Sequence, residues 1–173
     1  MKTLILLLTK GPHRFRIGPK RWHDWVIQCR KTVALQRWLP EAVVYVPSAV
    51  HTAGYPDELE YYRNELAKQG LTESIRLMSG RKALILEPFG WETIGQIERG
   101  SQFADVLDAK LVVVSTPFHY LRVRYLCRGK NASHKIAWGI PNVREALTDI
   151  MLAILFPVID FLKLREWFRD AVI

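Results

Sequence analysis

Short apolar runs alternate with longer amphipathic segments along the chain. The apolar runs, rich in Val, Ile and Leu, predict strands at 3–8, 42–46, 83–86, 111–115 and 135–138. Apolar residues at helical spacing predict helices near 22–38, 57–69, 92–107, 117–127 and 143–168. Strands that alternate with helices favour a parallel sheet covered on both faces. We therefore predict an α/β fold: a single three-layer αβα Rossmann-like domain over residues 1–173, with about five mainly parallel strands and the last helix packed on it.

The segment from 111 to 122 is the most informative. Its four apolar residues are typical of a buried parallel strand, and Pro117 suits the first turn of a helix whose N-cap is Thr116. His119 and Arg122 are three residues apart and so share one face of that helix. Free N–H groups and the helix dipole favour an anion at such a terminus. The simpler explanation is that the hydroxyl only caps the helix, as any strand-to-helix junction requires.

Polar groups also follow the other predicted strands, and ligands of open α/β sheets bind outside the carboxyl ends of the strands. Glu87 ends the third strand, and we expect His119 and Arg122 over the neighbouring strand. Glu87 and a neutral His119 are predicted to act as an acid/base pair. The residues predicted to hold an anionic ligand are Lys10, Arg14, Thr93, Ser115, Thr116 and Arg122. In the structural alternative, Glu87 only accepts backbone N–H groups and Arg122 pairs with Glu87 or Glu92.

Charge and composition limit the classes of ligand and partner that the chain can be expected to bind. The chain has 25 Lys and Arg against 17 Asp and Glu, a net charge of +8, which suits phosphorylated metabolites, nucleic acid or acidic lipid. Nucleic acid is less favoured because Trp22 and Trp25 fall on one helical stripe, where aromatic residues usually belong to the core. Cys29 and Cys127 lack metal-site spacing, so a reduced, cytoplasmic compartment is expected. No metal ligand is assigned, but Glu87, Glu92 and His119 could contribute ligands and leave a divalent metal open. The chain has neither a P-loop nor a dinucleotide fingerprint, so no cofactor is identified.

The two most apolar stretches are not predicted to span a membrane. Residues 1–10 have an apolar run too short for a signal peptide and predict the first strand. Residues 147–164 are interrupted by Asp149, Pro157 and Asp160. Pro157 is expected to kink or split the last helix. The basic residues near its end leave membrane-surface docking or dimerisation as a minor alternative.

Two segments resemble a known family. Residues 87–93 read Glu-Pro-Phe-Gly-Trp-Glu-Thr, and residues 114–123 read Val-Ser-Thr-Pro-Phe-His-Tyr-Leu-Arg-Val. They are similar to the signature segments of the SanA/YdcF/ElyC-like family of bacterial α/β domains. Four residues match this signature in type and spacing: Glu87, Thr93, His119 and Arg122. Gly90 stands where the family has Ser, Glu92 stands where it has Asn, and the family's glycine-rich turns after the first two strands are largely missing.

The resemblance implies a Rossmann-like domain, associated with the bacterial cell envelope, that holds a nucleotide-like or phosphate-bearing ligand. Several members carry an amino-terminal membrane anchor, and without one a cytoplasmic form is expected here. The leading hypothesis is a cytoplasmic domain that binds an anionic, phosphorylated or nucleotide-like small molecule at the strand ends and acts as a transferase or hydrolase. The alternative is a non-enzymatic module that senses a ligand in the same pocket or meets nucleic acid or a membrane surface.

Overall fold

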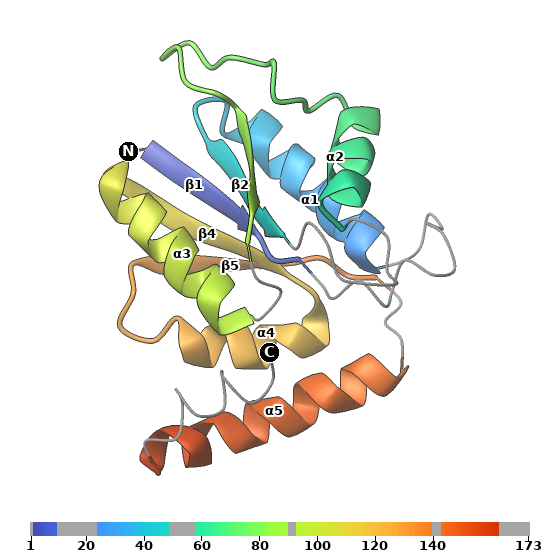
Figure 1. Cartoon of the computed structure of the whole chain (residues 1–173), viewed down its shortest axis with the longest axis vertical. Helices are drawn as coiled ribbons and strands as arrows, with labels where there is room; N and C mark the ends of the chain where they lie inside the picture. Colours follow the sequence, from blue (N-terminus) through green and yellow to red (C-terminus); the bar gives the residue numbers. More distant parts are fainter. Residues whose placement is uncertain (1, 10–23, 49–57, 90–92, 140–142, 163–173) are drawn as a thin grey trace.

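The computed structural model describes residues 2–9, 24–48, 58–89, 93–139 and 143–162 (Figure 1). Its strands are β1 (Lys2–Leu7), β2 (Val43–Ser48), β3 (Leu84–Pro88), β4 (Ala109–Ser115) and β5 (Ala132–Ile136). Its helices are α1 (Asp24–Trp38), α2 (Glu58–Lys68), α3 (Thr93–Val106), α4 (Pro117–Leu126) and α5 (Val143–Phe161). Strands and helices alternate, and helices flank an all-parallel sheet, which confirms the predicted three-layer α/β class.

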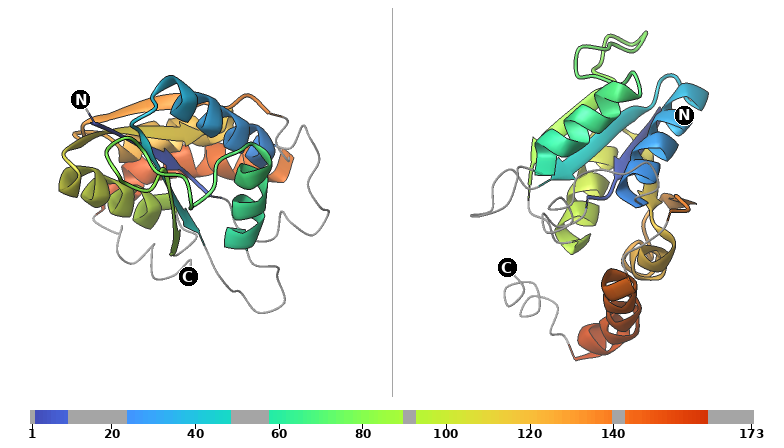
Figure 2. Two further views of the ribbon diagram at one scale, coloured as in Figure 1. Left: turned by 90° about the horizontal axis from the view of Figure 1, so that it is seen from above. Right: turned by 90° about the vertical axis from the view of Figure 1, so that its right-hand side faces the viewer.

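The five strands are ordered β3-β2-β1-β4-β5. The central strand β1 pairs with β2 and β4, so that Leu6 lies between Tyr45 and Val113. Helices α1 and α2 contact one another on one face of the sheet, and α3 and α4 do so on the other (Figure 2). This is the arrangement that right-handed crossovers produce. The strand order reverses between β1 and β4, where the chain returns from the β3 edge to the centre.

The centre of the core is the apolar run of β1, which extends one residue beyond the end of the strand to Leu8. Residues 4–8 are fully buried, as the length of that run predicts for a strand covered on both faces. Helix α3 comes close to β1 because Gly100 has no side chain: a Cβ there would lie 2.7 Å from Leu6 Cδ2. The sheet and both helix layers therefore share one apolar core.

Strand β5 begins and ends earlier than predicted. The apolar run 135–138 indicated the strand, whereas β5 covers Ala132–Ile136 and Trp138 is largely exposed beyond it. An edge strand pairs on one side only and keeps partial contact with water, so polar residues such as Ser133 and Lys135 are accepted within it. Apolar content alone therefore placed its ends wrongly.

Helix α5 packs against α4, on the side of α4 that faces away from the sheet (Figure 2). The expected split at Pro157 is wrong, because the helix continues through this residue to Phe161. Contacts on both sides of the proline hold it: Phe156 is buried, and Asp160 accepts a hydrogen bond of 2.8 Å from the Tyr125 hydroxyl. The predicted end at 168 lies outside the described residues. Within the described ranges, no helix is both long enough and apolar enough to cross a membrane.

Candidate anion-binding site

The carboxyl ends of β1 and β4 lie side by side where the strand order reverses, which is where doubly wound sheets bind their ligands. We expected His119 and Arg122, which follow β4, to lie over the strand next to that of Glu87. That expectation is wrong, because β2 and β1 separate β3 from β4. Strands that are consecutive in sequence are separated here because the crossover after β3 passes two strands before the chain re-enters the sheet.

Two buried glutamines hold the strand ends at this point. Gln28 of α1 donates from Nε2 to the carbonyl oxygens of Leu8 (3.1 Å) and Val114 (2.9 Å), and so joins the chain after β1 to β4. From α3, Gln96 accepts from the Thr9 backbone N–H (3.0 Å) and donates to the Thr9 hydroxyl (2.7 Å). Both side chains are fully buried. Sequence reasoning missed them, although a glutamine on the apolar stripe of a helix is a signal of buried hydrogen bonding.

Three side chains from two helices meet beside this point. His119, in the first turn of α4, is 3% exposed. Its Nε2 lies 3.0 Å from the Thr93 hydroxyl, at the start of α3, and 2.7 Å from Arg122 Nη2. The same guanidinium nitrogen donates to the Thr93 hydroxyl over 2.8 Å. Because arginine can only donate, the His119 Nε2 must accept, and in this arrangement the imidazole is neutral with its proton on Nδ1.

Arg122 also binds a carboxylate that the sequence did not bring forward as a site residue. Its Nη2 lies 3.1 Å from Asp149 Oδ1 of α5, and the two side chains are 12% and 11% exposed. In the sequence, Asp149 was only a charge that interrupts an apolar run. Arg122 Nη2 carries two hydrogens but has three acceptors around it, which belong to Thr93, His119 and Asp149. The positive charge of Arg122 therefore interacts both with the cluster formed by Thr93 and His119 and with helix α5.

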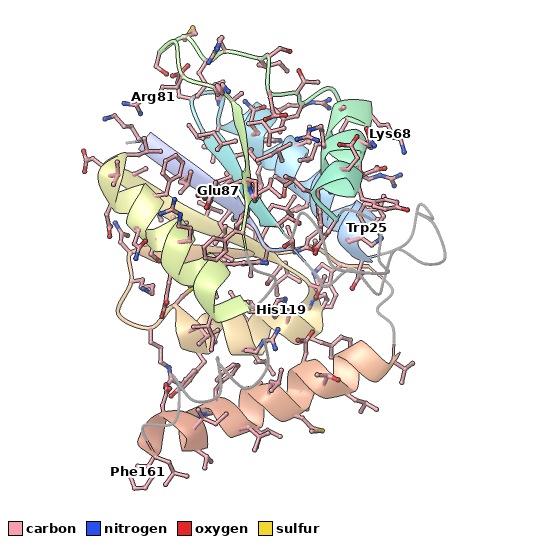
Figure 3. All side chains as sticks on the ribbon, viewed as in Figure 1. Trp25, Lys68, Arg81, Glu87, His119 and Phe161 are labelled. Atoms are coloured by element: carbon pink, nitrogen blue, oxygen red, sulfur yellow. The ribbon has the colours of Figure 1, made fainter. Side chains whose placement is uncertain are left out.

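Glu87 is held in a different place. Its carboxylate accepts a forked pair of hydrogen bonds from Arg99 of α3, at 2.6 Å from Nη2 and 3.2 Å from Nε, and another from the Tyr45 hydroxyl of β2. Hydrogen bonding to Arg99 is the main cause that lowers the pKa of Glu87, while burial and the same carboxylate raise the pKa of Tyr45. Figure 3 shows Glu87 on the sheet, apart from His119 on α4. The structure does not bring the two predicted acid/base residues together.

Two hydroxyls at the strand ends are buried. Ser115, which ends β4, and Ser48, which ends β2, are fully buried, and neither Oγ has a hydrogen-bond partner in the described part of the chain. Thr116 occupies the N-cap of α4 in an extended conformation, but its side chain makes no capping hydrogen bond. The simpler explanation of Thr116 as a capping hydroxyl is therefore not what the structure shows.

The other predictions concern two basic residues, a metal ion and the two cysteines. Lys10 and Arg14, expected to cover the anion, lie outside the described residues. Among the described residues, no cluster of three or more His, Cys, Asp or Glu side chains could hold a metal ion. Cys29 and Cys127 are both buried thiols, and burial raises the pKa of each.

Comparison with protein-family models, with curated proteins and with solved structures gives no significant match. The resemblance to the SanA/YdcF/ElyC-like family therefore rests on the two signature segments. Three of its four matching residues, Thr93, His119 and Arg122, form the hydrogen-bonded cluster described above, and the fourth, Glu87, is bound to Arg99.

Proposed function

We propose that this chain is a SanA/YdcF-like domain that binds an anionic, phosphorylated or nucleotide-like small molecule outside the carboxyl ends of β1 and β4. The observation that carries the proposal is the cluster of Thr93, His119 and Arg122, which places a guanidinium beside the first turn of α4 at the strand-order reversal. A fixed guanidinium binds phosphate or carboxylate in a fork, and a helix N-terminus adds N–H donors. The buried, unpaired hydroxyl of Ser115 and the net charge of +8 support an anion at this point.

Asp149 would compete with an anionic ligand for Arg122. Its carboxylate already contacts the nitrogen through which Arg122 would hold an anion, so a ligand has to share or replace that contact. A phosphate dianion carries more charge than one carboxylate and accepts more hydrogen bonds, and it competes on those grounds. The site therefore favours phosphate-bearing ligands over monocarboxylates.

The proposal has an enzymatic form, in which the chain is a transferase or hydrolase for a phosphate-bearing substrate. In that form His119 is the proton-transfer group, because its neutral Nε2 faces the guanidinium that would hold the substrate. Glu87 is not its partner, since Arg99 and Tyr45 bind that carboxylate elsewhere. In the non-enzymatic form the same residues sense the ligand without turnover.

Titration calorimetry with inorganic phosphate and with AMP tests the binding proposal on wild type, Arg122→Lys and Arg124→Ala. Arg124 is the matched control, because it is an exposed arginine on the same helix. We expect Arg122→Lys to weaken binding about tenfold or more, since a lysine cannot reproduce the guanidinium fork, and Arg124→Ala to leave it unchanged. Equal losses in both variants, or no binding by wild type, would contradict a built site at Arg122.

Native mass spectrometry then identifies any co-purifying anion, and phosphate release from that compound separates the two forms of the proposal. Turnover lost in His119→Gln supports the enzyme, whereas binding without turnover supports the sensor. Affinity for RNA that falls steeply with salt and ignores Arg122→Lys would favour a polyanion-binding surface instead.

A further inference from the structure

The described acidic side chains of helix α5 contact α4. Asp149 binds Arg122, and Asp160 accepts a hydrogen bond from Tyr125, so both described acidic side chains of the helix reach α4. Phe156 is buried on the same side. These contacts on the inner side explain how the helix is attached to the protein. They do not explain the residues on its outer side.

The outer side is apolar and exposed. Nine large apolar side chains, between 36% and 85% exposed, form what we call the α5 strip: Val143, Leu147, Ile150, Met151, Ile154, Leu155, Val158, Phe161 and Leu162. Phe161 points away from the protein at the end of the helix (Figure 3). The strip exposes on the order of 1,000 Å², more than the few hundred Å² usual for a patch on a monomer and enough for the ~800 Å² per partner of a stable interface.

We infer that the α5 strip is a self-association surface, through which two copies of this chain pair their α5 helices antiparallel about a two-fold axis. The spacing of the strip supports this occupant. Leu147, Ile154 and Phe161 recur every seven residues, with Val143, Ile150 and Pro157 at the intermediate positions, which is the spacing of the seam of a two-helix coiled coil.

The strip is also complementary to itself when reversed. A two-fold axis at residue 152 sets Leu147 opposite Pro157, Ile150 opposite Ile154, and Val143 opposite Phe161. In two of these pairs a large side chain faces a small one, and every one of these seam positions meets an apolar partner. In a parallel pair, Phe161 would face its own copy, and the helix dipoles would repel.

The charges of α5 favour a protein partner over a lipid surface. Helices that lie on membranes carry Lys and Arg on their polar side. The sequence of α5 has a single residue of this kind, Arg144 in the first turn, and the described polar side of the helix carries Asp149 and Asp160. Because the strip itself is uncharged, pairing through it does not set like charges directly against one another, despite a net charge of +8 per chain.

Sedimentation equilibrium across ~1–100 μM tests the pairing. We expect wild type to approach the mass of two 20.1 kDa chains and the double variant Leu147→Glu/Ile154→Glu to remain a monomer with unchanged circular dichroism. The control is Val106→Glu, because Val106 is 81% exposed at the end of α3 and lies outside the strip; it should pair like wild type. A monomeric wild type, or a double variant that still pairs, would overturn the inference.

A charge-pair experiment tests the antiparallel register and does not depend on the folding of the double variant. A chain with Ile150→Glu and a chain with Ile154→Lys should each be monomeric alone and form a mixed dimer together, because these positions face one another across the axis. A mixed dimer from Leu147→Glu with Leu147→Lys instead would overturn the antiparallel arrangement. Co-sedimentation of a monomeric wild type with phosphatidylserine vesicles would replace the second copy by a lipid surface.

Discussion

The contact between Arg122 and Asp149 supports a quantitative prediction. It joins the candidate site to α5 through a 3.1 Å ion pair whose side chains are nearly buried. The substitution Asp149→Asn keeps the size of the side chain and an acceptor oxygen but removes the charge. Arg122 then retains the Thr93 hydroxyl and the His119 ring nitrogen as acceptors, while its positive charge loses its carboxylate.

The expected loss follows from the geometry. At 3.1 Å and an effective dielectric constant of about 20, the Coulomb attraction is about 5 kcal/mol, from which the cost of desolvation has to be subtracted. Breaking a buried pair from one side typically costs about 3–5 kcal/mol. Because two acceptors remain, we expect Asp149→Asn to lower the free energy of unfolding by about 2–3 kcal/mol. For a chain of this length, that lowers Tm by roughly 5–10 °C.

Urea unfolding, followed by tryptophan fluorescence and circular dichroism, measures this loss. Asp105→Asn is the control, since Asp105 is an exposed carboxylate on α3, and it should change stability by less than about 0.5 kcal/mol. A double-mutant cycle with Arg122→Met and Asp149→Leu should show coupling of at least about 1 kcal/mol. Additive effects, or an Asp149→Asn variant as stable as wild type, would refute the view that this pair holds α5.

The same substitution should affect ligand binding in the opposite direction. Removing the competing carboxylate leaves more of the charge of Arg122 for an anion, so Asp149→Asn should bind inorganic phosphate about tenfold more tightly than wild type. Titration calorimetry at a temperature where the variant is folded measures this change. A variant that is destabilised and also binds phosphate more weakly would mean that Asp149 organises the site and does not compete for it.

Three further predictions concern the frame of the site. Gly139→Ala places a Cβ 2.6 Å from the Cα of Asp24, and because backbone cannot yield easily, it should cost about 1–3 kcal/mol in urea unfolding; no loss would mean that the loop after β5 does not press on α1. Burial, and then the charge of Arg124, lowers the pKa of His134, so the unfolded chain takes up this proton first and wild type should lose stability as pH falls through about 6.5. His134→Phe should flatten that part of the stability profile, and an unchanged slope would exclude His134 as the source. Gln28→Leu leaves two strand-end carbonyls without their donor and should cost about 2–3 kcal/mol, measured by the urea midpoint; a smaller loss than for an exposed glutamine would contradict its role as a bridge.

Much of the architecture was predictable from the sequence because it depends on local periodicity. A strand buried on both faces needs a continuous apolar run, and a helix beside it needs apolar residues at helical spacing, so the β/α alternation and nearly all the element positions could be predicted. The pairing of His119 with Arg122 is local too, since residues three apart on a helix lie on one face. Strand β5 was placed less well because an edge strand tolerates polar residues.

The strand order and the membership of the site were decided by tertiary structure. Sequence order made β3 and β4 look like neighbours, whereas the crossover separates them and leaves Glu87 with Arg99. Thr93 still reaches His119 because α3 and α4 pack on the same face. Asp149 enters the cluster only because α5 folds back onto α4, 27 residues along the chain from Arg122. Contacts between distant segments depend on how the layers of the fold pack in three dimensions, and local periodicity does not determine that packing.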